Sequence, residues 1–153
     1  MSKKINFSMQ NMKVIPKKDC FICKRKINEE DIIYEDKKFI AFLDLYPPTK
    51  GYTLLATKRH VEDITDLSKE DYLKFQRILF RISKAIKKTF KIKRIAIMQT
   101  GGILPHLHFH IIPIYGEFRD KFMDIFLKKS IILFSKNERK IISDKIKRNL
   151  SKK

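Results

Sequence analysis

Three of the four histidines in this chain occupy alternate positions in one short apolar run. They are His106, His108 and His110, and an apolar residue follows each of them. In a β-strand, successive side chains point to opposite faces. The spacing therefore predicts a strand with three imidazoles on one face and apolar side chains on the other. Neutral imidazole can be a nucleophile, a proton carrier or a metal ligand near pH 7, so we expect this row to carry chemistry.

The residues before the histidine row predict the elements that position it. Two apolar runs, 32–35 and 39–43, are separated by a polar turn and are typical of a β-hairpin. After a loop that contains Pro and Gly, a third strand is expected over Tyr52–Ala56. A strand over Ile95–Gln99 is followed by a Gly-Gly turn and then by the histidine row. We therefore expect these last two strands to be antiparallel neighbours.

One long helix is expected in the middle of the chain. Ser68, followed three residues later by Asp71, resembles a capping box. From Tyr72 to Phe90, apolar residues recur at steps of three and four, as on one face of a helix. Residues 117–150 also look helical, in two pieces, although the apolar run 130–134 could instead be a short strand. Hairpin-linked strands with one central helix place the chain in the α+β class.

Length and composition limit the classes of protein to consider. A chain of 153 residues with 43% hydrophobic residues fits one globular domain, which we expect to follow a loose basic arm at 1–18. No apolar stretch is long enough to span a membrane, and no secretory signal is recognisable. Two cysteines in C-x2-C spacing do not make a disulfide framework, so a cytoplasmic location is expected.

The formal net charge of +18 allows two interpretations. Clustered lysines can bind nucleic acid by releasing counterions from the phosphate backbone. However, the basic residues are spread along the whole chain, lysine far exceeds arginine, and isoleucine and phenylalanine are abundant. An AT-rich genome produces that composition without selection for binding. A nucleic-acid partner is therefore a secondary hypothesis.

Three segments of the chain resemble the histidine triad (HIT) family. His106–Ile112 matches the motif H-x-H-x-H followed by apolar residues. Phe39–Pro47 is similar to the family's strand that ends in an aspartate, and Lys50–His60 is similar to the strand and turn after it. On this resemblance the HIT domain covers 19–115, and 116–153 form a basic helical extension.

The resemblance implies a five-stranded antiparallel sheet with helices, paired as a homodimer. Family members hydrolyse or transfer nucleotides through a covalent nucleotidyl-histidine, which implies a purine nucleotide of AMP type as the substrate. In that scheme His108 is the nucleophile, His110 supports the phosphate and Asp44 binds the ribose hydroxyls. The apolar slot for the base is assigned to Ile22, Phe42 and Leu43, and contacts to the phosphate are assigned to Gln99, Gly101 and Gly102.

The two cysteines add a second element. A Cys2His2 set, enough to close a tetrahedral structural zinc site, is formed by Cys20, Cys23, His60 and His106. Some bacterial HIT proteins, and the related galactose-1-phosphate uridylyltransferases, are similar in binding zinc with such a set. The first histidine of the row then serves the metal. The alternatives are a redox C-x-x-C pair or two inert thiols, but a thioredoxin-like motif requires a βαβ pattern that we do not see.

Two departures from the family pattern favour slow turnover. Tyr52 stands where the family usually has histidine, and it can donate a hydrogen bond but cannot act as a base near pH 7. The residues just before the row, Ile103–Pro105, are apolar where many members carry polar donors to the phosphate. A nucleotide-binding regulatory module with weak catalysis is therefore the alternative function. The leaving group stays open between phosphoramidates, acyl-adenylates and dinucleoside polyphosphates.

Overall fold

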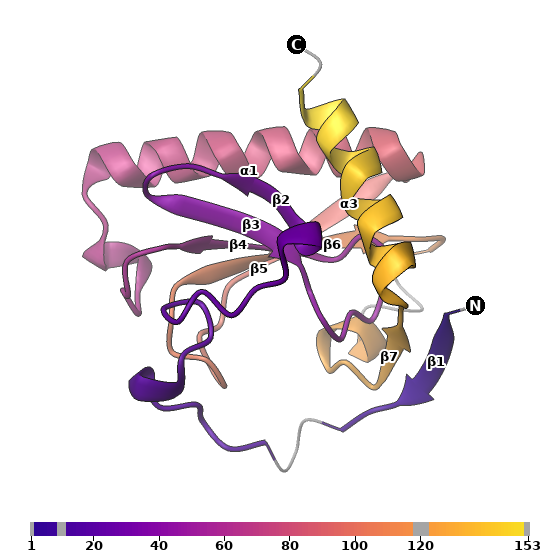
Figure 1. Cartoon of the computed structure of the whole chain (residues 1–153), viewed down its shortest axis with the longest axis horizontal. Helices are drawn as coiled ribbons and strands as arrows, with labels where there is room; N and C mark the ends of the chain where they lie inside the picture. The colour runs from indigo at the N-terminus through magenta and orange to yellow at the C-terminus, as the bar shows by residue number, and fades with distance from the viewer. Residues whose placement is uncertain (1, 9–11, 118–122, 152–153) are drawn as a thin grey trace.

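A five-stranded antiparallel sheet is covered on one face by a long helix (Figure 1). The structure, a computed structural model, describes residues 2–8, 12–117 and 123–151. The strand order across the sheet is β2-β3-β4-β6-β5. The strands are β2 at Ile32–Glu35, β3 at Phe39–Leu43, β4 at Thr53–Thr57, β5 at Arg94–Met98 and β6 at His108–Ile114. The predicted α+β class and five-stranded sheet are confirmed.

The histidine strand β6 lies between β4 and β5 and pairs with both of them. The alternation of residues predicts a strand through all three histidines, but β6 begins only at His108. The prediction is wrong for His106, because the segment before β6 is tied to a loop instead. There the Leu107 N–H donates to the Val61 carbonyl oxygen at 2.7 Å. His108 and His110 are thus held in a strand with neighbours on both sides.

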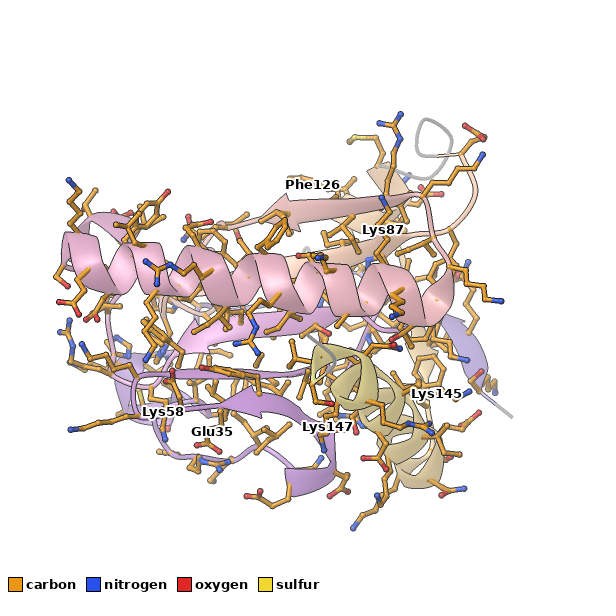
Figure 2. All side chains as sticks on the ribbon, turned by 90° about the horizontal axis from the view of Figure 1, so that it is seen from above. Glu35, Lys58, Lys87, Phe126, Lys145 and Lys147 are labelled. Atoms are coloured by element: carbon orange, nitrogen blue, oxygen red, sulfur yellow. The ribbon has the colours of Figure 1, made fainter. Side chains whose placement is uncertain are left out.

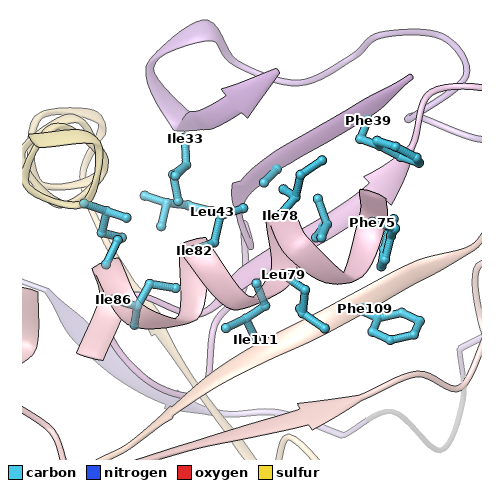
Figure 3. Close-up of a cluster of buried hydrophobic side chains, with 14 of the residues drawn as sticks. Ile33, Phe39, Leu43, Phe75, Ile78, Leu79, Ile82, Ile86, Phe109 and Ile111 are labelled. Atoms are coloured by element: carbon cyan, nitrogen blue, oxygen red, sulfur yellow. The ribbon is translucent and has the colours of Figure 1, made fainter. Parts of the chain in front are cut away.

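The helix α1 spans Lys69–Phe90, as the apolar period predicts. It begins after Ser68, whose hydroxyl accepts the Asp71 N–H at 3.1 Å. Its buried residues are Phe75, Ile78, Leu79, Ile82, Ala85 and Ile86. Figure 3 shows this stripe packed against the sheet next to Leu43 and Ile111. This contact forms the main hydrophobic core, on the face of β6 opposite to the two histidines.

The loop between β3 and β4 passes close to the last turn of α1. Gly51 in this loop has a φ of +81°, in the left-handed region, and a side chain at this position would clash with the ring of Phe90. Only glycine meets both demands. The turn sets the start of β4 and directs Tyr52, which is 1% exposed, into the same apolar cluster as Phe42.

Segments from the two ends of the chain meet in a second, two-stranded sheet (Figure 1). The strand β1 at Lys3–Asn6 pairs antiparallel with β7 at Ser130–Leu133. The prediction of a loose arm over 1–18 is therefore wrong for Lys3–Asn6, and the alternative of a strand within residues 130–134 is confirmed. The arm is polar and has no period of its own, so its strand depends on the backbone groups that β7 offers it.

The helix α3, Lys136–Leu150, packs against α1 (Figure 2). Arg139 on α3 is 7% exposed and makes a two-point ion pair with Asp31, with 2.8 Å between Nε and Oδ1. Its Nη1 also donates to the carbonyl oxygen of Leu45 at 3.2 Å. The C-terminal extension is therefore fixed to the loop that follows β3.

The part of the chain that the structure describes also contains short 3-10 helices at Lys17–Asp19, Glu29–Asp31 and Ile64–Asp66. Among the helices that the structure describes, none combines the length and the apolar character needed to cross a membrane. The boundary between a HIT domain at 19–115 and an extension at 116–153 stays a prediction.

Candidate active site

His108 opens β6 on the face of the sheet away from α1 and is 6% exposed. Its Nδ1 lies 2.5 Å from the backbone carbonyl oxygen of His106. A carbonyl oxygen can only accept, so Nδ1 carries the proton and Nε2 keeps its lone pair. Burial lowers the pKa of His108 below its usual value, although the His106 carbonyl acts in the opposite direction. The imidazole is therefore neutral at physiological pH and has one nucleophilic nitrogen.

His110 lies next to His108 on the same face, with 4.8 Å between the two ring centroids. Its Nδ1 is 2.9 Å from the hydroxyl oxygen of Tyr52. Burial, together with the neighbouring His108 and Lys128, lowers the pKa of His110 to about 3. Burial and the charge of Asp44 raise the pKa of Tyr52, so this residue stays a neutral phenol. Tyr52 and His110 thus form an uncharged, hydrogen-bonded pair.

Four side chains that can bind a metal meet at the other end of the histidine row. They are Cys20, Cys23, His60 and His106, and their ligand atoms all lie within 4.8 Å of one another. The His106 Nδ1 lies 3.3 Å from the Cys20 Sγ and 3.4 Å from the Cys23 Sγ. The His60 Nδ1 lies 3.2 Å from the Cys23 Sγ. The structure therefore brings together all four residues of the predicted set.

In both histidines of this set, the ring nitrogen that points away from the cysteines has a hydrogen-bond partner, which orients the ring. The His106 Nε2 is 2.7 Å from the carbonyl oxygen of Thr57, so it carries the proton and leaves the Nδ1 lone pair directed at the cysteines. The His60 Nε2 is 3.3 Å from the Glu62 carboxylate, which favours the same tautomer. Metal-bound histidines usually have such a partner. Zinc bonds of about 2.0–2.3 Å place tetrahedral N and S ligands about 3.5 Å apart, so the donor set fits zinc.

Asp44 follows β3 and is 8% exposed. Its Oδ1 accepts the Tyr46 N–H at 2.9 Å, and its Oδ2 accepts from the Lys128 ammonium at 2.6 Å. Burial by itself raises the pKa of Asp44, but Lys128 and the Tyr46 N–H bring it below the usual value. The site therefore holds a buried, ionised carboxylate. No pattern in the sequence indicates Lys128, because it lies 84 residues from Asp44 in a basic segment without a motif.

The apolar residues assigned to the base slot are divided between the two faces of the sheet. Ile22 and Phe42 belong to the apolar cluster on the histidine face, and each is 4% exposed. Leu43 belongs to the core that also contains Ile82 of α1. The prediction that Leu43 joins the other two in one slot is therefore wrong, because consecutive residues of a strand point to opposite faces.

The residues assigned to the phosphate lie in the turn between β5 and the histidine row. They are Gln99, Gly101 and Gly102. Gly101 has a φ of +61°, in the left-handed region, and a side chain there would lie 4.0 Å from the carbonyl oxygen of Glu62. This turn therefore lies beside the loop that carries His60. The predicted contact with phosphate stays a prediction.

The sequence has clear relatives among known proteins. A family model described as the HIT domain matches residues 25–117. An uncharacterised HIT-like protein of Methanocaldococcus jannaschii is 31% identical over 126 residues, which cover 72% of this chain and 97% of that protein. The adenosine 5'-monophosphoramidase hnt1 of Schizosaccharomyces pombe is 31% identical over 103 residues, which cover 61% of this chain and 73% of that protein.

Solved structures share the fold. A hypothetical histidine triad nucleotide-binding protein of Sulfolobus tokodaii matches with a TM-score of 0.68 and 27% identity, over 86% of this chain and 89% of that one. A zinc-bound histidine triad family protein of Mycobacterium smegmatis matches with a TM-score of 0.63 and 22% identity, over 86% and 91% of the two chains. At 22% identity the likeness concerns the fold alone.

Proposed function

Because this chain belongs to the HIT family, we propose that it is a hydrolase or nucleotidyl transferase that acts at the α-phosphate of a purine nucleotide of AMP type. The tautomer of His108 carries this proposal. The His106 carbonyl holds the Nδ1–H of His108, so the Nε2 lone pair is available to a phosphorus atom. The phosphoramidase among the relatives supports an adenylylated substrate.

The reaction consists of two displacements at phosphorus. The Nε2 lone pair of His108 forms a bond to the α-phosphorus, and the bond to the leaving group breaks. The electron pair of that bond departs with the leaving group, which takes up a proton. Water then attacks the same phosphorus, the P–N bond breaks with its electron pair returning to Nε2, and a proton of the water is released to solvent. Another nucleophile in place of water turns hydrolysis into transfer.

His110 stabilises the charge on the phosphate oxygens. In this proposal the hydroxyl of Tyr52 donates to the Nδ1 of His110, which lies 2.9 Å away, and the ring proton of His110 is on Nε2. An Nε2–H directed at a phosphate oxygen stabilises the transition state as a donor in an oxyanion hole does. The ionised Asp44 accepts hydrogen bonds from the ribose hydroxyls on its remaining lone pairs. Ile22 and Phe42, which are apolar and on the same face, contact the base.

Zinc has a structural role in this proposal. It is held by Cys20, Cys23, His60 and His106, whose ligand atoms lie at distances that suit the ion. A protein with the same fold is zinc-bound, which supports the assignment. Four protein ligands leave no open position for a substrate. The site therefore ties the N-terminal turn to the start of the histidine strand and takes no part in the reaction.

We further propose a cytoplasmic homodimer that pairs along β5. This strand lies at the edge of the sheet, and Ile97 on it is 44% exposed. An exposed apolar edge strand is open to pairing with another chain.

Sedimentation velocity at micromolar concentration should show a dimer that Ile97→Lys converts to a monomer. Leu73→Lys, at a 45% exposed apolar residue of α1, is the control that leaves the dimer intact. A monomeric wild-type protein contradicts the homodimer.

Incubation with an adenosine phosphoramidate tests the proposed activity. We expect AMP release, followed by chromatography, and an AMP adduct on the protein, detected by mass spectrometry after denaturation at alkaline pH. Adenosine with the same amine but without phosphate is the control substrate and gives neither signal. Stoichiometric nucleotide binding without turnover or adduct contradicts the enzyme and supports the regulatory module.

A second candidate function, the binding of a single-stranded nucleic acid, is supported by one groove of about 1150 Å³ between α1 and the end of α3. Phe80, 64% exposed, lies in it beside Lys84. Unpaired cations next to an exposed aromatic ring are typical of such sites. Affinity for single-stranded RNA should fall steeply with salt, and an affinity that is independent of salt contradicts this function. The basic residues of the groove are Arg81, Lys84, Lys87, Lys88 and Lys91. None of them has an acidic partner within the described chain.

A further inference from the structure

The C-terminal extension places a cation inside the candidate active site. Lys128 lies beyond residues 25–117, which match the HIT domain. Its ammonium is nevertheless 2.6 Å from the Asp44 Oδ2 and 5.2 Å from the centroid of the Tyr52 ring. The side chains of Lys128 and Asp44 are 17% and 10% exposed. Tyr52 is hydrogen-bonded to His110, so only one side chain separates the ammonium from the imidazole that we assign to the phosphate.

The segment that carries Lys128 is fixed on both sides of this residue. Before it, Ile125 is 8% exposed and belongs to the apolar cluster on the histidine face of the sheet. After it, the Ile132 N–H donates to the carbonyl oxygen of Pro47 at 2.8 Å. This contact joins β7 to the loop that follows Asp44. The extension is therefore attached to the site at two points, and Lys128 lies between them.

The chemistry of the site needs a cation at this place. Burial is the main cause that lowers the pKa of His110 to about 3, so this imidazole brings no positive charge to the phosphate. The segment just before the row, Ile103–Pro105, offers no polar side chain. A phosphoryl group carries negative charge throughout its transfer, and catalysis of this reaction depends on stabilising that charge. An ammonium has three N–H donors, of which Asp44 takes one, so two are left for oxygen atoms of a substrate.

We propose that Lys128 contacts the substrate: its ammonium remains beside Asp44 and donates to the phosphate of the bound nucleotide. This inference rests on the proposed nucleotide site and adds a residue to it from outside the HIT domain. The extension thus supplies the charge that the residues before the histidine row lack. It also explains why Lys128 is directed inward, whereas Lys129 pairs at the surface with Asp124.

Comparison of AMP with adenosine isolates the contact to the phosphate. Calorimetric titration uses the full, zinc-loaded chain. Lys128→Met keeps the length of the side chain and removes its charge. It should weaken AMP binding about ten- to a hundredfold and change adenosine binding by no more than about twofold. Lys128→Arg should retain much of the preference for AMP. Lys129→Met is the matched control, because its side chain is 60% exposed, and it leaves both affinities unchanged.

Three outcomes would overturn the inference. An equal loss for AMP and adenosine means that Lys128 only holds Asp44, and no loss means that it lies outside the site. A gain in affinity means that the lysine blocks the ribose position. Lys128→Met could also destabilise the chain by leaving Asp44 buried and unpaired. The double variant Asp44→Asn, Lys128→Met removes that carboxylate, and its preference for AMP must still fall below that of Asp44→Asn alone.

This titration is separable from the test of the proposed activity. AMP binding that depends on Lys128, without AMP release or adduct from the phosphoramidate, refutes the catalytic proposal and leaves the inference standing. Full turnover with an unchanged preference for AMP in Lys128→Met refutes the inference alone.

Discussion

At the metal end of the histidine row, His106 donates its Nε2–H to the Thr57 carbonyl and turns Nδ1 toward the cysteines. At the nucleotide end, His108 donates its Nδ1–H to the His106 carbonyl and keeps Nε2 unprotonated. The two imidazoles are two residues apart, and both are buried. They differ in which nitrogen meets a backbone carbonyl. That choice decides which lone pair is free, and so whether a histidine suits a metal or a phosphorus atom.

The chemical groups around the two ends of the row also differ, and each set suits a different ligand. Thiols and the Glu62 carboxylate surround the metal end, where the donors would hold a cation. A phenol, an ionised carboxylate and an ammonium surround the nucleotide end, where they can bind hydroxyls and phosphate. Substitutions at the metal end should therefore affect stability first, and substitutions at the nucleotide end should affect the reaction first.

The largest effect is expected from His108→Gly. Removal of the attacking nitrogen should abolish the AMP adduct and slow AMP release at least about a thousandfold. Zinc content should stay close to that of the wild type, because His108 is outside the proposed ligand set. Turnover at the wild-type rate in this variant would rule out the covalent route and favour the regulatory module.

Loss of the metal is expected to have the next largest effect, and on stability. Elemental analysis should find about one zinc per chain. Cys20→Ser and His106→Ala should lose it and lower the thermal midpoint by on the order of 10 °C, because metal binding is coupled to folding. His110→Ala, a histidine substitution at the other end of the row, is the control that keeps its zinc. A wild-type chain that is metal-free after growth in zinc and equally stable in chelator contradicts the site.

A smaller kinetic effect is expected from the pair Tyr52 and His110. His110→Ala should slow AMP release by about ten- to a thousandfold, the range for losing one charge-stabilising donor. Tyr52→Phe removes only the hydrogen bond to His110 Nδ1, so its rate should fall by about tenfold or less. Single-turnover measurements separate this chemical step from product release. If Tyr52→Phe is as slow as His110→Ala, the tyrosine itself contacts the substrate.

The smallest effect concerns the dependence of stability on pH. His110 has a pKa of about 3 in the folded chain, against about 6.5 in an unfolded one. Below pH 6.5, His110 binds a proton in the unfolded state but stays neutral in the folded state until the pH approaches about 3. The free energy of unfolding should therefore fall as the pH decreases from 6.5 toward 3, by at most about 1.4 kcal/mol per pH unit.

Comparison with His110→Gln isolates this contribution, since both proteins keep the four proposed zinc ligands. When measured by urea unfolding, the free energy of unfolding should decrease less between pH 7 and pH 5 for His110→Gln than for the wild type. Equal slopes for the two proteins would mean that His110 is protonated in the folded chain, and that its hydrogen bond with Tyr52 has a different donor.

Local patterns in the sequence were sufficient for most of the fold. The step of three and four residues in Lys69–Phe90 and the short apolar runs of the sheet each depend on neighbours a few positions away. The alternation that predicts a strand failed at His106, because a loop contact of Leu107 competes with the strand there. The same alternation of side chains along a strand explains why Leu43 and Phe42 do not share a slot, since adjacent strand residues face opposite sides of the sheet.

By itself, the sequence determined the residue types that can do chemistry: three alternating histidines, and two cysteines with two histidines that suit zinc. Only the tertiary structure decided which nitrogen of each imidazole is free, that Lys3–Asn6 pairs with β7, and that Lys128 meets Asp44. These features depend on contacts between residues far apart in the chain, such as the 84 positions between Lys128 and Asp44. A side chain's spacing along a strand or helix is set locally, but its partner is set by how distant segments pack, and no local period encodes that.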